Sequence, residues 1–151
     1  MPGPALFFDR ANWVGRSSYL PISDAEARGR HERREAYGVY FPAQRLELEL
    51  YFTATYCATN FLAGNGKPEL SYSFEERDSR LFLFEAGYYA YDEHGKVTSY
   101  DEYYFTPDGK VTITKHSGAE HVVGTNTVDV TGNWEPIPAF GEFRALLRRE
   151  R

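Results

Sequence analysis

Tyrosines and carboxylates gather in one short stretch of this 151-residue chain. Six of the twelve tyrosines lie between Tyr88 and Tyr104, and residues 85–108 contain six carboxylates and one lysine, so this segment alone equals the formal net charge of the protein, −5. A tyrosine offers a large rigid ring with a hydroxyl at its tip, and a neighbouring carboxylate attracts cations. The stretch could therefore contact a basic partner, or carry out acid–base chemistry if one of its carboxylates is buried.

Contact with a partner needs the rings and the acids on the same face of a sheet. The alternation of side chains along three predicted strands places five such residues together, and the sequence predicts a protein-binding surface there. Tyrosine also has a high strand propensity, so an ordinary half-exposed sheet remains an alternative. The residues of the predicted surface are Tyr88, Asp92, Tyr100, Glu102 and Tyr104.

Acid–base chemistry is the second hypothesis, and it concerns the other face of the same strands. The predicted register sets Asp101 opposite Gly87, where no side chain fills the space. Burial would raise the pKa of a carboxyl group there and let it act as a general base for a small molecule, unless it lies at the sheet margin or meets an arginine. The residues of this alternative pocket are Glu85, Tyr89, Asp101 and Tyr103.

Metal and motif-based chemistry have weaker support. His94, His116 and His121 lie at predicted turns, and the last two could be neighbours across a hairpin, but structural zinc sites show tighter spacing of cysteine and histidine. The chain also lacks a Gly-rich phosphate loop, a nucleophile elbow and an HExxH motif. The sequence thus predicts no metal and no cofactor, and it favours a non-enzymatic protein while leaving an enzyme without a known motif open.

Composition limits the classes of protein. The length predicts a single domain over 1–151, and one cysteine, Cys57, excludes an intrachain disulfide. Arginines outnumber lysines thirteen to four, but acids accompany those near Arg30, which argues against nucleic-acid binding. No apolar run approaches the length of a membrane span and the N-terminus does not resemble a signal peptide, so a cytoplasmic location is expected.

Local patterns predict the elements that carry these residues. Ser23 and Glu26 form a capping box for a helix over 24–36, ending near Gly38, and alternation over 45–56 predicts a strand with one wet face. Further strands are expected to follow, and the apolar spacing over 140–147 predicts a short C-terminal helix. The fold class is therefore predicted as α+β, with a twisted antiparallel sheet of about six to eight strands.

Two similar turns determine the predicted register. The tetrapeptide Gly-Lys-Val-Thr occurs at 95–98 and again at 109–112, which indicates a repeated hairpin with a three-residue bulged loop. Such loops would set Asp92 opposite Lys96 and Thr106 opposite Lys110. The division of side chains between the two faces depends on this parity.

Two segments resemble known families. Residues 91–99, with the sequence YDEHGKVTS, resemble the YD-type hairpin repeat of large polymorphic-toxin shells, and residues 134–143, WEPIPAFGEF, are similar to the ends of several small bacterial immunity proteins. The second resemblance implies a cytoplasmic bacterial inhibitor that masks the active site of a partner toxin, and an acidic face would suit a basic toxin domain. A homodimer formed through the sheet edges or the polar face is a third possibility.

Overall fold

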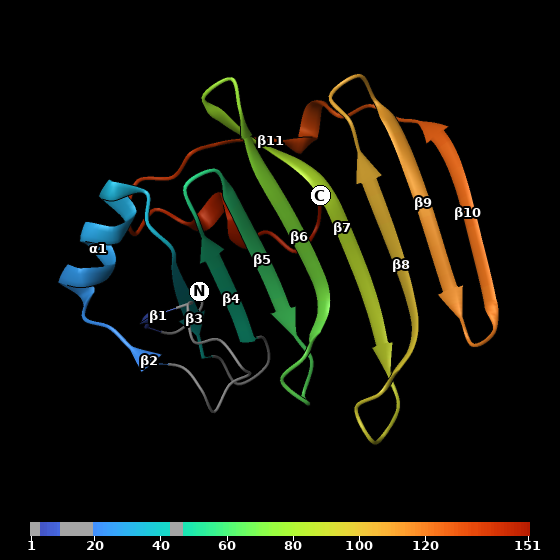
Figure 1. Cartoon of the computed structure of the whole chain (residues 1–151), viewed down its shortest axis with the longest axis horizontal. Helices are drawn as coiled ribbons and strands as arrows, with labels where there is room; N and C mark the ends of the chain where they lie inside the picture. The colour runs from blue at the N-terminus through green and yellow to red at the C-terminus, as the bar shows by residue number, and fades with distance from the viewer. Residues whose placement is uncertain (1–3, 10–19, 43–46) are drawn as a thin grey trace.

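The computed structural model describes residues 4–9, 20–42 and 47–151, and most of these residues lie in one twisted antiparallel sheet (Figure 1). Neighbours along the chain are neighbours in the sheet from β3 to β10, and β1 and β2 extend it beyond β3. The strands are β1 (Leu6–Asp9), β2 (Leu20–Pro21), β3 (Tyr37–Phe41), β4 (Glu47–Phe52), β5 (Tyr56–Leu62), β6 (Pro68–Arg77), β7 (Arg80–Tyr91), β8 (Val97–Phe105), β9 (Lys110–Ser117), β10 (Glu120–Thr127) and β11 (Trp134–Pro136).

The predicted fold class, α+β, is wrong because strands greatly outweigh helices. Within the described residues the sheet has eleven strands rather than six to eight, and strands account for 55% of the structure against 13% for helices. The predicted C-terminal helix is only a 3-10 turn, η4 (Arg144–Leu147), because Gly141, with φ 88°, turns the chain immediately before it. The described part of the chain is thus sheet-dominated and contains one α-helix.

That helix, α1 (Asp24–Arg33), begins as predicted and ends early. The amide of Glu26 donates to Ser23 Oγ at 3.1 Å, which confirms the N-cap, and Arg34 leaves the helix in the left-handed conformation with φ 57°. Gly38 lies in β3 instead of ending the helix. A Cβ there would lie 2.2 Å from the Phe8 ring, so glycine lets β1 and β3 pack closely.

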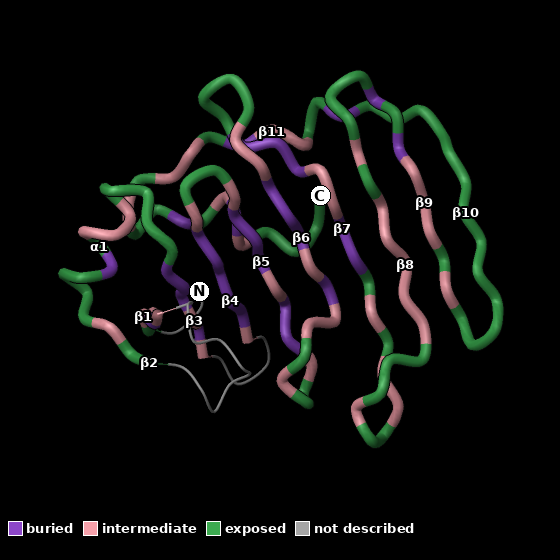
Figure 2. The backbone as a smooth tube through the Cα atoms, viewed as in Figure 1, coloured by how far each residue is buried: buried purple, intermediate pink, exposed green. Residues whose placement is uncertain are grey.

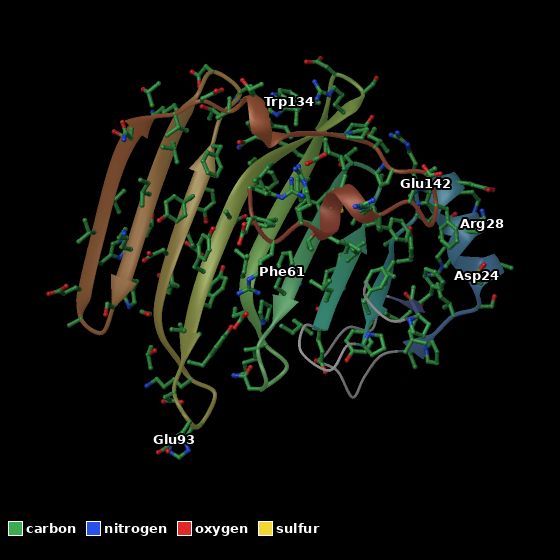
Figure 3. The ribbon with its side chains drawn as sticks, turned by 180° about the vertical axis from the view of Figure 1, so that it is seen from behind. Asp24, Arg28, Phe61, Glu93, Trp134 and Glu142 are labelled. Carbon is green, nitrogen blue, oxygen red and sulfur yellow. The ribbon has the colours of Figure 1, made fainter. Side chains whose placement is uncertain are left out.

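A C-terminal strap, defined as residues 134–151, covers one face of the sheet. Seen from behind in Figure 3, it crosses β3 to β7. Phe143 and Leu146 on the strap pack into the main core, and Thr59 Oγ1 donates to the buried carbonyl of Leu146 at 2.9 Å. We call the covered side the strap face. Its buried core from the strands includes Tyr37, Val39, Leu48, Leu50, Phe52, Cys57, Phe61, Leu70, Tyr72 and Phe74.

The opposite side carries a smaller cluster near the other end of the sheet, where Phe8, Tyr51 and Ala58 are buried together. Beyond β7 few strand residues are buried (Figure 2), and Val111 of β9 is the one buried residue in β8 to β10. No residue of β8 is buried, and all eight residues of β10 are exposed. Strands β8 to β10 therefore form a single-layer extension of the sheet.

The strap closes on a buried acid. Glu135, in β11, is 5% exposed and accepts from Arg151 at 2.7 Å and from Arg148. The guanidinium of Arg151 also lies over the Phe74 ring, 4.9 Å from its centroid. Two cations thus stabilise a carboxylate that burial alone would destabilise, and the aromatic ring packs against one of these cations.

We predict that Glu135→Ala lowers the free energy of unfolding by about 3 kcal/mol, because it leaves the buried guanidinium of Arg151 without its counter-ion. Urea unfolding measures the change. Glu69→Ala is the matched control: its exposed pair with Arg149, at 2.7 Å, should contribute less than about 1 kcal/mol. Equal losses for the two variants would contradict a structural role for the buried cluster.

Candidate functional site

The two hairpin loops of the tyrosine-rich block have the predicted form. The amide of Asp92 donates to Lys96 O, and that of Thr106 to Lys110 O, both at 2.9 Å. Gly95 and Gly109 take positive φ angles of 75° and 92°, which only glycine adopts without strain. Both predicted loop pairings are confirmed.

A β-bulge in β8 changes the register just beyond the first loop. Tyr91 pairs with Val97 but Ala90 pairs with Ser99, so Thr98 has no partner on β7. From there Glu102 lies opposite Gly87. The predicted pairing of Gly87 with Asp101 is therefore wrong by one residue, which is enough to exchange the two faces of the strand.

A second bulge lies at the β6–β7 pairing. Leu83 pairs with Phe74 and Glu85 with Ser73, so Phe84 is the extra residue. Leu83 stays on the strap face, while Glu85 turns to the opposite face. The sequence hypothesis placed these two residues on the same side.

The predicted protein-binding residues are consequently divided. Tyr100, Glu102 and Tyr104 share the face opposite the strap, as expected. Tyr88 lies on the strap face, paired with Leu70 on one side. Asp92 lies in the hairpin loop, where its Oδ1 accepts from the amides of His94 and Lys96, at 2.9 Å each.

The residues of the alternative pocket are divided as well. Asp101 and Tyr103 lie on the strap face, whereas Glu85 and Tyr89 lie on the other. Asp101 is 39% exposed and pairs with Lys115 at 3.6 Å, so it is neither enclosed nor free of a cation. These four residues do not form one pocket.

The strap face does carry a hollow of about 460 Å³ between β8 and the strap. Tyr103 lines it, with Tyr72 and Phe105, but Asp101 does not. The carboxylate in its lining is Asp129, whose pKa is lowered by hydrogen bonds from Thr131. A low pKa does not favour a general base at this position.

The rearranged register brings together a different set, which we call the acidic face. Glu102 is at its centre: Tyr89 and Tyr104 each direct a hydroxyl to its carboxylate at 3.4 Å. A Cβ on Gly87 would lie 2.5 Å from the Tyr89 hydroxyl, so this glycine leaves room for the ring to reach across. The acidic face consists of Glu85, Tyr89, Tyr100, Glu102 and Tyr104.

Two carboxylates share this surface without a cation. The pKa of Glu85 is raised, first by desolvation and then by the charge of Glu102. Desolvation, followed by the charges of Glu85 and Glu102, raises the pKa of the Tyr104 hydroxyl to about 12. Within the described part of the chain, hydroxyl groups are the partners of both acids, and no lysine or arginine pairs with either.

A row of aromatic rings runs beside the two acids across four strands. Tyr89, Tyr100, His116 and His121 lie on successive strands from β7 to β10, because each is the register partner of the next. The rings of Tyr100 and His116 stack at 4.9 Å with an interplanar angle of 10°. The other two pairs of the row are not stacked: Tyr89 and Tyr100 are tilted by 36°, and His116 and His121 meet edge to face at 85°.

The predicted proximity of His116 and His121 is confirmed, with ring centroids 5.8 Å apart. The Nδ1 atom of His116 is buried and has no hydrogen-bond partner among the described residues. His94 is remote, at a loop tip beside Glu93. In the described ranges, no three His, Cys, Asp or Glu residues are placed to hold a metal ion.

Comparison with known proteins adds no family. No family model matches the chain, and neither a curated protein nor a solved structure matches it. Among the residues described, no helix has both the length and the apolar character needed to cross a bilayer. The function of this chain must therefore be inferred from the chemistry of the site itself.

We predict that Glu85→Gln stabilises the folded protein at neutral pH. Because the folded-state pKa of Glu85 is raised, its contribution to stability is present in acid and is lost as the pH rises through that pKa. The advantage of the variant should thus grow from acid to neutral pH and stay below about 1 kcal/mol, since solvent screens the site. Urea unfolding at several pH values measures it.

Asp101→Asn is the control for this series, because it removes an acid that is paired with Lys115 on the other face of the same hairpin. It should show no gain at neutral pH. A Glu85→Gln variant that is less stable than the wild type at every pH would show that the carboxylate is not under electrostatic stress.

Proposed function

We propose that this chain is a non-enzymatic protein-binding module whose acidic face docks on a basic protein surface, as an immunity-type inhibitor does when it covers the active site of a toxin. The observation that carries the proposal is the pair Glu85 and Glu102, two neighbouring acids without a cation among the described residues. A partner that supplies lysine or arginine side chains would relieve their repulsion.

The ionised form of Glu85 is already destabilised in the unbound protein. Desolvation and the charge of Glu102 both disfavour ionised Glu85 before any partner is present. An acid held in this state destabilises the free fold slightly, and groups with perturbed pKa values cluster at functional sites. On the strap face of the same strands, by contrast, Asp101 has Lys115 as its counter-ion.

The tyrosines support the same conclusion by another route. Tyr89, Tyr100 and Tyr104 surround the acids with rigid side chains that lose little conformational entropy on binding. Tyr104 is 40% exposed, so much of its ring is free to contact a partner. The hydroxyls of Tyr89 and Tyr104 orient the carboxylate of Glu102, which prepares it to accept from a guanidinium or an ammonium group.

The segment that resembles immunity proteins, residues 134–143, lies in the strap and not on the acidic face. Trp134 packs against Phe82 with ring centroids 4.8 Å apart, and Phe143 lies in the main core. These residues hold the strap on the sheet and do not contribute to the acidic face. The resemblance therefore supports the class of protein, and the acidic face supports the mode of binding.

We predict that Tyr100→Ala combined with Glu102→Ala weakens binding to the partner by at least about 2 kcal/mol, roughly thirtyfold in Kd, because it removes a ring and a charge from the centre of the contact. The partner to test is the product of the reading frame immediately upstream, titrated by calorimetry. Rescue of cells that express this product should weaken in parallel.

A matched control lies on the same strands. Tyr88→Ala with Asp101→Ala also removes one tyrosine and one acid, but from the strap face, and should change the binding free energy by less than about 0.5 kcal/mol. Equal effects of the two double variants, or no binding to a toxin encoded upstream, would refute the assignment of the acidic face.

We also predict that affinity falls as the pH is lowered through the raised pKa of Glu85, since a basic partner binds the ionised form and protonation removes that attraction. Calorimetry at several pH values measures the trend. Glu85→Gln should bind more weakly at neutral pH and show a flatter pH profile than the wild type. An unchanged profile in this variant would mean that Glu85 is outside the contact.

A further inference from the structure

Strand β10 is a long sheet edge that lies open. All eight of its residues are exposed, and it pairs with β9 on one side alone among the described strands (Figure 1). Val122 and Val123, which point to opposite faces, are each 59% exposed. A row of unpaired backbone groups on such an edge is a template for pairing with another strand.

The free backbone groups can be identified from the hairpin geometry. The hydrogen bond from Thr106 N to Lys110 O shows that the backbone groups of Lys110 point toward β8. Because these groups alternate in direction along a strand, the N–H and C=O of Val111 point toward β10 and bond its register partner Asn126. Even-numbered residues of β10 therefore bond β9, and odd-numbered residues face outward. The outward residues are His121, Val123, Thr125 and Thr127.

One end of this outward row is closed. The amide of Thr127 donates to Asn126 Oδ1 at 2.8 Å, and the amide of Val128 returns inward to Gly109 O at 2.8 Å. The outward amides that remain are those of His121, Val123 and Thr125. They are equally spaced, with Val123 at the centre.

The edge also lacks the residues that usually prevent pairing. Residues 121–127, HVVGTNT, contain no lysine, proline or carboxylate, although such residues commonly block exposed edges. The valines and threonines among them favour strand pairing. Nothing in this stretch repels a strand of identical sequence.

We propose that β10 pairs antiparallel with β10 of a second copy of this chain, about a two-fold axis at Val123. In this register Val123 bonds the partner subunit's Val123, and His121 bonds the partner subunit's Thr125. All three outward amides then find carbonyl acceptors. Glu120 lies opposite the partner subunit's Asn126, so no like charges meet.

A second copy fits this edge better than an open chain of copies. Among the strands that the structure describes, the sheet ends beyond β1 in β2, which has two residues. Pro21 of β2 has no amide hydrogen, so the described strands offer β10 no long complementary edge at that end. Pairing of β10 with itself is isologous and closes at a dimer. The axis is perpendicular to the sheet, so the acidic faces of both copies lie on the same side.

The expected association is weak. One strand edge buries less surface than the roughly 1,200 Å² of a stable standard interface, so we expect a dimer dissociation constant on the order of 10–100 μM. Sedimentation velocity over a concentration series from about 1 to 500 μM, which spans this range, should show a monomer that converts to a dimer by mass action and not to larger species.

Charge substitution at the axis tests the register. Val123→Lys and Val123→Glu, at an exposed position that should not affect folding, each set like charges opposite one another and should weaken the homodimer about five- to tenfold. An equimolar mixture of the two variants should recover association, because the ammonium group of one variant then meets the carboxylate of the other across the axis. Circular dichroism of each variant checks the fold.

Three results would overturn the proposal. They are a monomer at every concentration, a dimer that neither substitution weakens, and a mixture of the two variants that associates no better than either alone. The last two would indicate another interface or register, and a strand from a different protein would then be the occupant to seek. The assay uses this chain alone, so its outcome is independent of the proposed partner.

Discussion

An antiparallel sheet must bury at least one face to be stable, and here the C-terminal strap does so only over β3 to β7 (Figure 3). Burial of Phe143 and Leu146 and the buried cluster of Glu135 and Arg151 hold the strap in place. The strap does not extend over β8 to β10. These strands are therefore attached to the rest of the sheet mainly by backbone pairing and by hairpin loops. This unequal cover leaves both the acidic face and the β10 edge available to other molecules.

The acidic face follows from where this cover stops. Strand β7 is the border: its first half, with Leu81 and Leu83, lies under the strap, and its second half belongs to the extension. Glu85 lies just past the bulge at the border, where solvent is reduced enough to raise its pKa but not excluded. A deeper position would have required a counter-ion within the fold, as Glu135 has, and a fully exposed one would have relaxed the repulsion.

Local chemistry made part of this fold predictable. The cap at Ser23 and the loops at Gly95 and Gly109 each depend on a few neighbouring residues, and the structure has all of them. The strand predicted over 45–56 is present over 47–52 as β4, while residues 45 and 46 lie outside the described ranges. Its predicted wet face is wrong, because Glu49 and Tyr51 are buried on the side that alternation assigned to solvent. The pairing of β1 with β3 depends on the contact of Phe8 with Gly38, which are far apart in the sequence, and has no local signal.

The site was harder to predict, because it depends on two bulges. Phe84 and Thr98 have no turn chemistry that marks them as bulge positions, and each bulge is visible only in the pairing of one strand with its neighbour. Each bulge reverses the parity of the residues beyond it. Tyr88 and Tyr89 are adjacent, so one of them lies on each face whichever register is chosen. The tyrosine content of the two faces therefore could not show that the predicted register was wrong.

The two bulges and the open edge are connected through one physical requirement. The single-layer strands have little core to fix their positions, so register must come from the backbone itself, through bulges and loops with positive φ angles. Among the described residues, no further segment covers the acidic face or the outer edge of β10. The two proposed contacts with other protein chains would use this surface in different ways: through side-chain charge on the acidic face, and through backbone hydrogen bonds at the β10 edge.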